Sequence, residues 1–186
     1  MGRSRRWDLA ARLLAGLGVT GIAFAHHLDS GNTQVSFQVG HLGLNWFTAA
    51  FGELSGEFVL DPDGHGGHLS VTVQMASLQS RSSYWNERLR SAQWLDAERY
   101  PEMSFRSTGI ELEAAERATV HGELTLHGVT RPLALAISDI DCPYGGEATP
   151  GRCHFLGRGT LRRSDYGLPH GFWAGGDEVE ILVRGD

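Results

Sequence analysis

The sequence predicts an all-β domain of about eight antiparallel strands, interrupted once by a short helical insertion. The first observation is a strict alternation of apolar and polar side chains, which places Val35, Phe37 and Val39 on one face of a half-buried strand. The second is the return of this two-residue period along the chain, at the spacing expected of a sandwich or a barrel. The third is a single break around residues 80–100, where the spacing becomes helical.

Turn residues separate the expected strands, as in Asp61-Pro62-Asp63-Gly64 between the second strand and the third. Strands with one apolar face must pack against something, and closure into a barrel also removes exposed sheet edges. Such a barrel is filled by its own side chains or holds one small elongated ligand, and alternation alone does not separate the two. The expected strands are residues 33–39, 54–60, 69–75, 103–105, 120–126, 133–137, 155–161 and 179–183.

The side chains expected to point into the barrel share the apolar faces of these strands. They either line a ligand-binding interior or form an ordinary core. They are Val35, Phe37, Val39, Leu54, Phe58, Leu60, Val71, Val73, Met75, Phe105, Leu124 and Leu126.

The start of the chain is typical of a cleaved export signal. Several arginines precede an apolar stretch, residues 13–24, which ends in small residues and predicts cleavage before His26. The stretch has about 12 residues against the roughly 20 that span a bilayer, so a membrane anchor is disfavoured. The paired arginines leave the general and the twin-arginine export routes open. We expect residues 1–25 to be a signal peptide and residues 26–186 to form one domain.

The net charge and the absence of common catalytic motifs exclude several functions. The formal net charge is −6, and removal of the arginine-rich signal makes it about −9. An acidic protein is poorly suited to nucleic acid, so we expect no such partner. The sequence contains no G-x-S-x-G nucleophile elbow and no H-E-x-x-H metal motif. The usual hydrolase activities therefore lack their residues, and we expect neither an enzyme nor a cofactor.

Two cysteines, Cys142 and Cys153, flank a segment rich in proline and glycine that is typical of a turn between strands. In an oxidising compartment they are expected to form a disulfide, which contributes roughly 3 kcal/mol for a loop of this size. A metal site is the weaker interpretation, because a second pair of thiols is missing.

Four blocks of sequence stand in the order found in one known family. The blocks are residues 29–41 with 51–62, residues 87–91 with 94–96 and 100–108, residues 122–133 and residues 163–168. They resemble those of the YceI-like proteins, exported bacterial barrels related in shape to lipocalins, and the resemblance covers nearly all of the chain after the signal. The Cys142–Cys153 hairpin is not part of that family's motifs.

The resemblance implies a periplasmic, lipocalin-like barrel whose interior holds a polyisoprenoid or another long-chain amphiphile. The implied task is transport, storage or sequestration, by a monomer or homodimer with at most transient membrane contact. Within the helical insertion, Tyr84, Trp85 and Trp94 suit either a lid or docking surface, or plain core packing. Arg162 and Arg163 are candidates for binding an anionic head group, because guanidinium binds phosphate through two hydrogen bonds. A salt-bridged strand end is the alternative for these arginines.

Two other functions stay open. The new terminus at His26, with its free amine and a histidine from elsewhere, forms a ligand set for copper, so a metal-dependent oxidoreductase accessory is one alternative. The other is a barrel with a solid core that acts as a partner protein. His127, directly before Gly128, is expected to serve a turn through hydrogen bonds.

Overall fold

The computed structural model describes residues 24–41, 45–60, 66–114, 116–141, 154–170 and 175–185. The expected signal peptide lies outside these residues except for Phe24 and Ala25, and so do Cys142 and Cys153. Signal cleavage and the disulfide therefore stay predictions.

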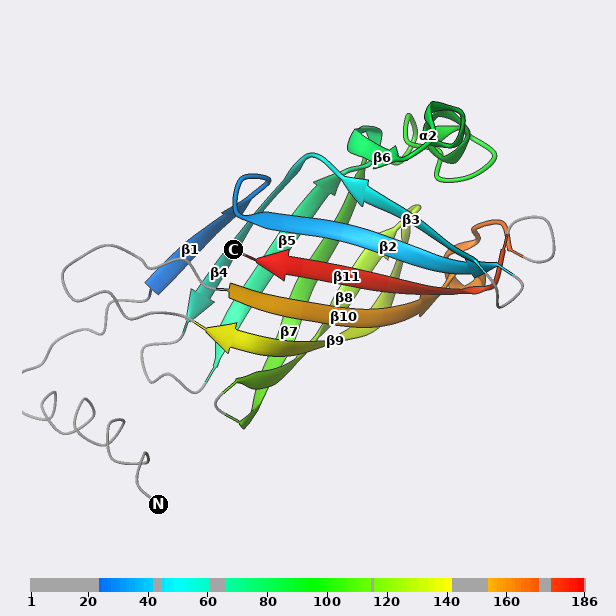
Figure 1. Ribbon diagram of the computed structural model, residues 1–186. Coiled ribbons are helices and arrows are strands. Elements are labelled where there is room, and N and C mark those ends of the chain that lie inside the picture. Colours follow the sequence, from blue (N-terminus) through cyan, green and yellow to red (C-terminus); the bar gives the residue numbers. More distant parts are fainter. Residues whose placement is uncertain are drawn as a thin grey trace, which may run out of the picture.

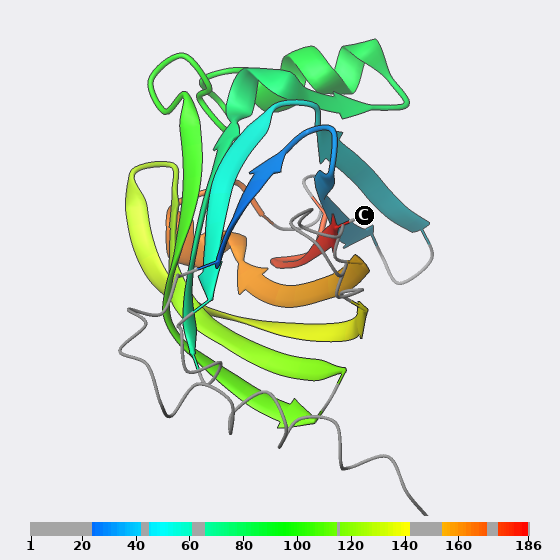
Figure 2. The ribbon, with the colours of Figure 1, turned by 90° about the vertical axis from the view of Figure 1, so that its left-hand side faces the viewer.

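The described residues form one antiparallel sheet of eleven strands that curls into a lipocalin-like barrel, with a single α-helix across one end (Figures 1 and 2). The strand order is β1-β4-β5-β7-β8-β9-β10-β11-β2-β3-β6. The all-β fold class is confirmed, although the strand number is eleven and not eight. The strands are β1 (Phe24–Asp29), β2 (Thr33–His41), β3 (Asn45–Phe51), β4 (Leu54–Leu60), β5 (Gly67–Gln74), β6 (Leu78–Ser80), β7 (Glu102–Ala114), β8 (Arg117–Leu126), β9 (Val129–Asp141), β10 (His154–Arg162) and β11 (Glu178–Gly185).

The eight expected strands correspond to β2, β4, β5 and β7 to β11. Strands β1, β3 and β6 were not expected. The sequence of β1 overlaps the signal cleavage region, β3 contains the run Thr48-Ala49-Ala50-Phe51 without polar alternation, and β6 has three residues. Met75, expected in a strand, lies in the short 3-10 helix η1 (Met75–Ser77), which directly follows β5.

Each edge strand of the sheet is connected along the chain to a strand at the opposite side: β1 leads into β2, and β5 leads into β6. Strand β1 pairs with β4 and runs into β2 through a tight turn, where the Leu54 backbone N–H donates to Ser30 Oγ at 2.9 Å. At the other edge, β5 continues through η1 into β6, which pairs with β3. The Gly52 N–H donates to the Ser77 carbonyl at 3.1 Å, and the Gln74 N–H donates to the Glu53 carbonyl at 3.0 Å. These bonds hold the β3–β4 corner against β5 and so stabilise the curl.

The apolar faces predicted from alternation do point inward. Most of the predicted interior side chains are buried, while Phe37, Phe58 and Val71 are half-buried and the side chain of Leu60 is outside the described set. Their burial follows from the period of two, because successive side chains of a strand point to opposite faces. The buried ones are Val35, Val39, Leu54, Val73, Met75, Phe105, Leu124 and Leu126.

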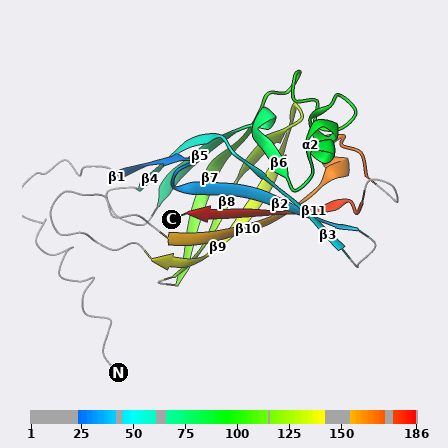
Figure 3. The ribbon, with the colours of Figure 1, turned by 45° about the horizontal axis from the view of Figure 1, so that its top comes forward.

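Helix α2 (Ser83–Arg90) lies in the predicted insertion and covers one end of the barrel, close to β6 (Figure 3). Asn86 Oδ1 accepts from the Ser80 N–H at 2.7 Å and from Ser80 Oγ at 2.6 Å. Arg90 Nη1 donates to the Ala76 carbonyl at 2.9 Å, and Leu89 is buried against the core. The helix is thus fixed to the η1–β6 segment through Asn86 and Arg90. Among the described residues, no helix has the length and apolar content to cross a membrane.

Candidate ligand-binding site

A cavity of about 490 Å³ lies inside the barrel, at the end that α2 covers. Its lining is almost entirely apolar, and it comes from β2, β3, β7, β8, β10, β11, the short helix η1, residues 163–169, Gly175 and the helical insertion. A volume of this size falls within the roughly 300–1,000 Å³ of small-molecule sites. The cavity is therefore the candidate binding site of the described part of the molecule.

One wall of the cavity is the inward face of β2. Val35, Phe37 and Val39 line the cavity from this strand. On the neighbouring strand β11, Val179 pairs with Val39 and Ile181 pairs with Phe37, and both also line it. Because a strand rises about 3.3 Å per residue, the apolar wall from Val35 to Val39 is about 13 Å long.

A chain of aromatic rings connects this wall to the helix above it. Phe37 lies 6.0 Å from Phe51 and 6.3 Å from Phe47, measured between ring centroids. Phe47 contacts Trp85 of α2 edge-on at 6.0 Å, and Trp85 contacts Trp94 edge-on at 6.4 Å. Edge-to-face pairs contribute about 0.5–1.5 kcal/mol each beyond the burial of their area. The insertion is thus a roof whose own aromatic side chains line the cavity.

The cavity also has one charged residue in its lining, as far as the described residues show. Arg163, in the 3-10 helix η2 (Arg163–Tyr166), is only 7% exposed. Its Nη2 donates to the carbonyl oxygens of Gly175, at 2.7 Å, and of Gly176. Burial lowers the pKa of Arg163, and the carboxylate of Asp177 partly opposes this shift. The guanidinium still carries its charge at physiological pH, because arginine stays protonated in proteins.

The structure separates the two arginines that were predicted to bind a head group. Arg162 is exposed and pairs with Glu178 across the β10–β11 ladder. Its side chain lies outside the cavity lining, since neighbouring residues at the strand end point to opposite faces. Of the two arginines, only Arg163 lines the apolar cavity, and a head-group role for either arginine stays a prediction.

The predicted interior residues divide into two groups. Some line the cavity: Val35, Phe37, Val39, Met75 and Leu126. Others lie outside its lining: Leu54, Phe58, Val71, Val73, Phe105 and Leu124. Leu54, Val73, Phe105 and Leu124 belong to the buried core, and Val71 packs against it. At Gly122, for example, the ring of Phe105 occupies the space that a Cβ would need. A role of this second group in ligand binding stays a prediction.

Several lining residues were absent from the predicted interior set. Trp85 and Trp94, which suited either a lid or docking surface or core packing, line the cavity together with Leu89 and Leu95. The aromatic content of residues 80–100 was the available signal for this roof. Phe47 and Phe51 of the unexpected strand β3 also line the cavity. Leu161 and Ile181 line it from expected strands, whose alternation was the available signal.

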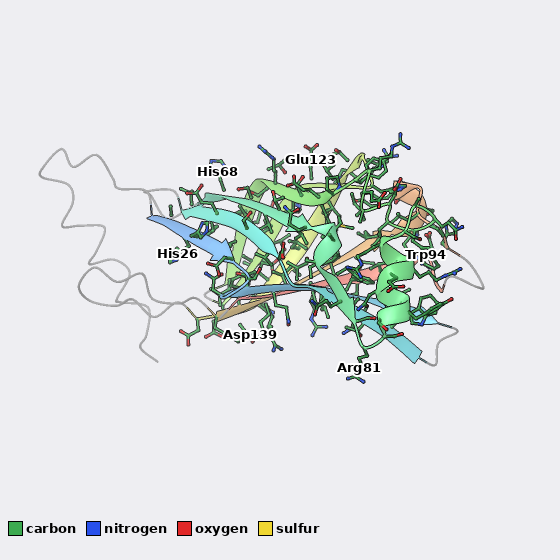
Figure 4. All side chains as sticks on the ribbon, turned by 90° about the horizontal axis from the view of Figure 1, so that it is seen from above. His26, His68, Arg81, Trp94, Glu123 and Asp139 are labelled. Atoms are coloured by element: carbon green, nitrogen blue, oxygen red, sulfur yellow. The ribbon has the colours of Figure 1, made fainter. Side chains whose placement is uncertain are left out.

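The structure gives no support to the copper alternative. His26 lies in β1 opposite Phe58, at the end of the molecule away from Trp94 and the roof (Figure 4). Within the described residues, no group of three histidine, cysteine, aspartate or glutamate side chains could hold a metal ion.

Comparison with known proteins assigns the family. A sequence model of the YceI-like domain matches residues 26–185. The chain belongs to the YceI-like family. A UPF0312 protein of Shewanella baltica (strain OS185) is 28% identical over 177 residues, covering 93% of this chain and 91% of that protein. Protein YceI of Escherichia coli O157:H7 is 29% identical over 153 residues, covering 80% of this chain and 78% of that protein.

Solved structures share the YceI-like fold. BcnA of Burkholderia cenocepacia superposes with a TM-score of 0.72 at 23% identity, covering 84% of this chain and 97% of BcnA. A polyisoprenoid binding domain from Saccharophagus degradans superposes with a TM-score of 0.58 at 14% identity, covering 88% of this chain and 99% of that domain. At these identities, the likeness shows the fold alone.

Three of the YceI-like sequence blocks, residues 100–108, 122–133 and 163–168, contact one another beside the cavity. His127 and Gly128 form the two-residue turn between β8 and β9, both with positive φ (52° and 74°), as a type I′ turn requires. The His127 ring lies 4.5 Å from the Tyr100 ring, and its Nδ1 lies 3.1 Å from the Tyr166 carbonyl oxygen. The predicted turn role of His127 thus extends to joining the insertion, the hairpin and η2 at the end of the barrel that contains the cavity.

Proposed function

We propose that this YceI-like protein binds the apolar chain of a long-chain amphiphile inside the cavity, with polyisoprenoids as the first candidate class. The observation that carries the proposal is the cavity of about 490 Å³ with its almost entirely apolar lining. An apolar chain in the cavity makes dispersion contacts with this lining and gains roughly 25 cal/mol per Å² of apolar surface removed from water.

The proposal includes export and a carrier role. Residues 1–25 direct the chain to the periplasm and are removed there, and the protein transports, stores or sequesters its ligand without catalysis. The signal-like sequence supports export, and the apolar cavity supports carriage. The structural neighbour from Saccharophagus degradans is a polyisoprenoid binding domain, which gives the first class of ligand to test.

The test begins with the full chain, expressed with its own leader in a bacterium and purified from the periplasm. Native mass spectrometry, followed by solvent extraction and mass spectrometry of the extract, should detect about one apolar molecule per chain. A protein that carries no such molecule, and that binds neither a prenol nor a fatty alcohol at micromolar concentration, contradicts the proposal. A metal adduct that disappears in His26→Ala would favour the oxidoreductase alternative instead.

A pair of neighbouring variants locates the ligand. Leu161 lines the cavity from β10, whereas the side chain of Thr160 is exposed on the other face of the same strand. Leu161→Trp reduces the free volume and should weaken prenol binding about tenfold or more. Thr160→Trp adds the same indole outside the barrel and should leave binding unchanged. Equal effects of the two substitutions, in variants with native circular dichroism, would place the ligand elsewhere.

A further inference from the structure

Two large apolar side chains are exposed to solvent in the part of the chain that the structure describes. Tyr84, on helix α2, is 62% exposed, and Leu112, near the end of β7, is 58% exposed. A single exposed apolar side chain is ordinary in a folded protein. The charged groups around each of the two therefore decide what it can contact.

Leu112 lies among acidic residues. Its neighbours Glu111 and Glu113 are exposed, and so is Glu116 in the turn that leads to β8. The exposed Arg117 at the start of β8 offsets one of these three carboxylates. An anionic lipid surface repels such a cluster, so this end of the barrel is unsuited to a membrane that contains anionic lipids.

Tyr84 lies between two basic residues. Arg81 and Arg88 are both exposed, and Arg81 extends outward beside α2 (Figure 4). Residues four apart on a helix share one face, so Tyr84 and Arg88 are neighbours on the outer face of α2. Neither arginine forms an ion pair with a carboxylate of the described residues. Glu87, also exposed, is the acidic residue of this helix.

The roof is a basic region of an acidic protein. Residues 81–100 contain four arginines and three carboxylates, a net charge of +1, whereas the whole chain has a formal charge of −6. An anionic surface therefore attracts the roof and repels most of the rest of the molecule. Tyrosine suits such a surface as well, because its ring is apolar and its hydroxyl is polar.

The outer face of α2 also contacts the lining of the cavity. The ring of Tyr84 meets the ring of Trp85 edge-on, with 5.5 Å between centroids. Arg88 Cζ lies 5.9 Å from the centroid of the Trp94 ring, in cation–π geometry. Trp85 and Trp94 both line the cavity. A surface that binds Tyr84 and Arg88 is thus separated from the cavity by single aromatic side chains.

We propose that the outer face of α2, formed by Arg81, Tyr84 and Arg88, docks the protein on a phospholipid membrane that contains anionic lipids. The two arginines bind lipid phosphates, and the Tyr84 ring lies at the level of the head groups. This inference goes beyond the proposed function, because docking requires no ligand in the cavity. It places the roof of the cavity against the membrane.

The experiment measures co-sedimentation with lipid vesicles of the protein obtained by expressing the full chain with its own leader. One set of vesicles mixes phosphatidylethanolamine with the anionic phosphatidylglycerol, and the other contains phosphatidylcholine alone. At low salt the wild-type protein should bind the anionic vesicles about tenfold or more tightly than the neutral ones. High salt should remove this difference, because it screens charges at a surface.

Substitutions on the outer face of α2 test the contact residue by residue. Tyr84→Ala, Arg81→Gln and Arg88→Gln should each weaken binding to the anionic vesicles about threefold or more. Glu87→Gln should strengthen it, because a carboxylate that faces the lipid phosphates is removed. Prenol binding in solution should stay within about twofold of wild type in Tyr84→Ala, which shows that this variant is folded.

Two matched controls lie far from α2. Leu112→Ala removes the other exposed apolar side chain, in the β7–β8 hairpin, and Arg184→Gln removes an exposed arginine near the end of β11. Both positions are at the end of the barrel away from α2 (Figure 1). Both variants should bind the anionic vesicles as the wild-type protein does.

Three results would overturn the docking proposal. The first is a wild-type protein that does not bind the anionic vesicles, or that binds the neutral ones equally well. The second is a loss in the two control variants as large as that in the α2 variants, since the whole surface would then be responsible. The third is unchanged binding in all three weakening α2 variants, which would place the contact on another surface. None of these results affects the proposed function, because ligand binding is measured in solution without vesicles.

Discussion

Asp177 shows how one carboxylate stabilises the rim of the cavity. It accepts hydrogen bonds from the backbone N–H and the hydroxyl of Ser164, and the Arg163 N–H donates to its carbonyl oxygen at 2.9 Å. The hydrogen bond from the Ser164 backbone, followed by that from its side chain, lowers the pKa of the Asp177 carboxyl. The charged form is therefore more stable in the folded protein than in the unfolded chain.

This pKa shift predicts a pH dependence of folding. A carboxyl with a lowered folded pKa stabilises the fold above its unfolded pKa, near 3.9, and loses this contribution as the pH falls through the folded value. Asp177→Asn should lower the free energy of unfolding by about 1 kcal/mol at pH 7, a value reduced for solvent exposure. Urea denaturation between pH 2 and pH 7 should show the difference from wild type shrinking below about pH 4. A difference independent of pH would contradict the role of the charge.

Gly122 gives a second test at a single residue. It is buried in β8, and a Cβ there would collide with the Phe105 ring and with the carbonyl oxygen of Arg106. Gly122→Ala should therefore reduce the free energy of unfolding by about 1–3 kcal/mol in urea denaturation. Gly109, on the neighbouring strand β7, has no atom within 4 Å of its Cβ position, so Gly109→Ala should be neutral or stabilise by about 0.5 kcal/mol. Similar losses in both variants would contradict steric crowding as the cause.

At the level of elements, α2 is the roof of the cavity. Trp85 lines the cavity and contacts Phe47 and Trp94, whereas its neighbour Tyr84 is 62% exposed. Trp85→Ala should release a bound fluorescent prenol analogue about tenfold faster, because the aromatic link between the roof and β3 is lost. Tyr84→Ala should change the rate little. Stopped-flow displacement by unlabelled prenol measures both rates, and an unchanged rate in Trp85→Ala would show that α2 does not retain the ligand.

Alternation determined which elements could be predicted. In β8 the buried residues recur at every second position, so a period of two identified both the strand and its inward face. The edge strand β6 has three residues, which is shorter than any window in which a period can be recognised. Strand β3 pairs with β2 on one side and β6 on the other, and its successive apolar residues give no alternation. These two strands owe their conformation to partners distant in sequence.

At the level of the whole molecule, the position of the cavity could not be predicted, although part of its wall could. Alternation placed Val35, Phe37 and Val39 on an inward face, but it gives no volume. The free space depends on where α2 crosses the barrel and on how core side chains outside the cavity lining, such as Phe105, pack together. The separation of Arg162 from Arg163 also depends on where β10 ends and η2 begins, a boundary that the sequence pattern does not mark.

The expected disulfide between Cys142 and Cys153 depends both on the β9–β10 pairing and on an oxidising compartment. Asp141 at the end of β9 and His154 at the start of β10 are register partners, and they directly precede Cys142 and follow Cys153. This pairing brings the ends of the cysteine-containing segment together, which favours a disulfide in an oxidising compartment. Periplasmic protein unfolded without a reductant should show no thiol that reacts with maleimide. Reduction should lower the Tm by roughly 6–12 °C, from a contribution of about 3 kcal/mol. In the double variant Cys142→Ser and Cys153→Ser the reductant should have no effect on the Tm, and two reactive thiols in the unreduced wild-type protein would contradict the pairing.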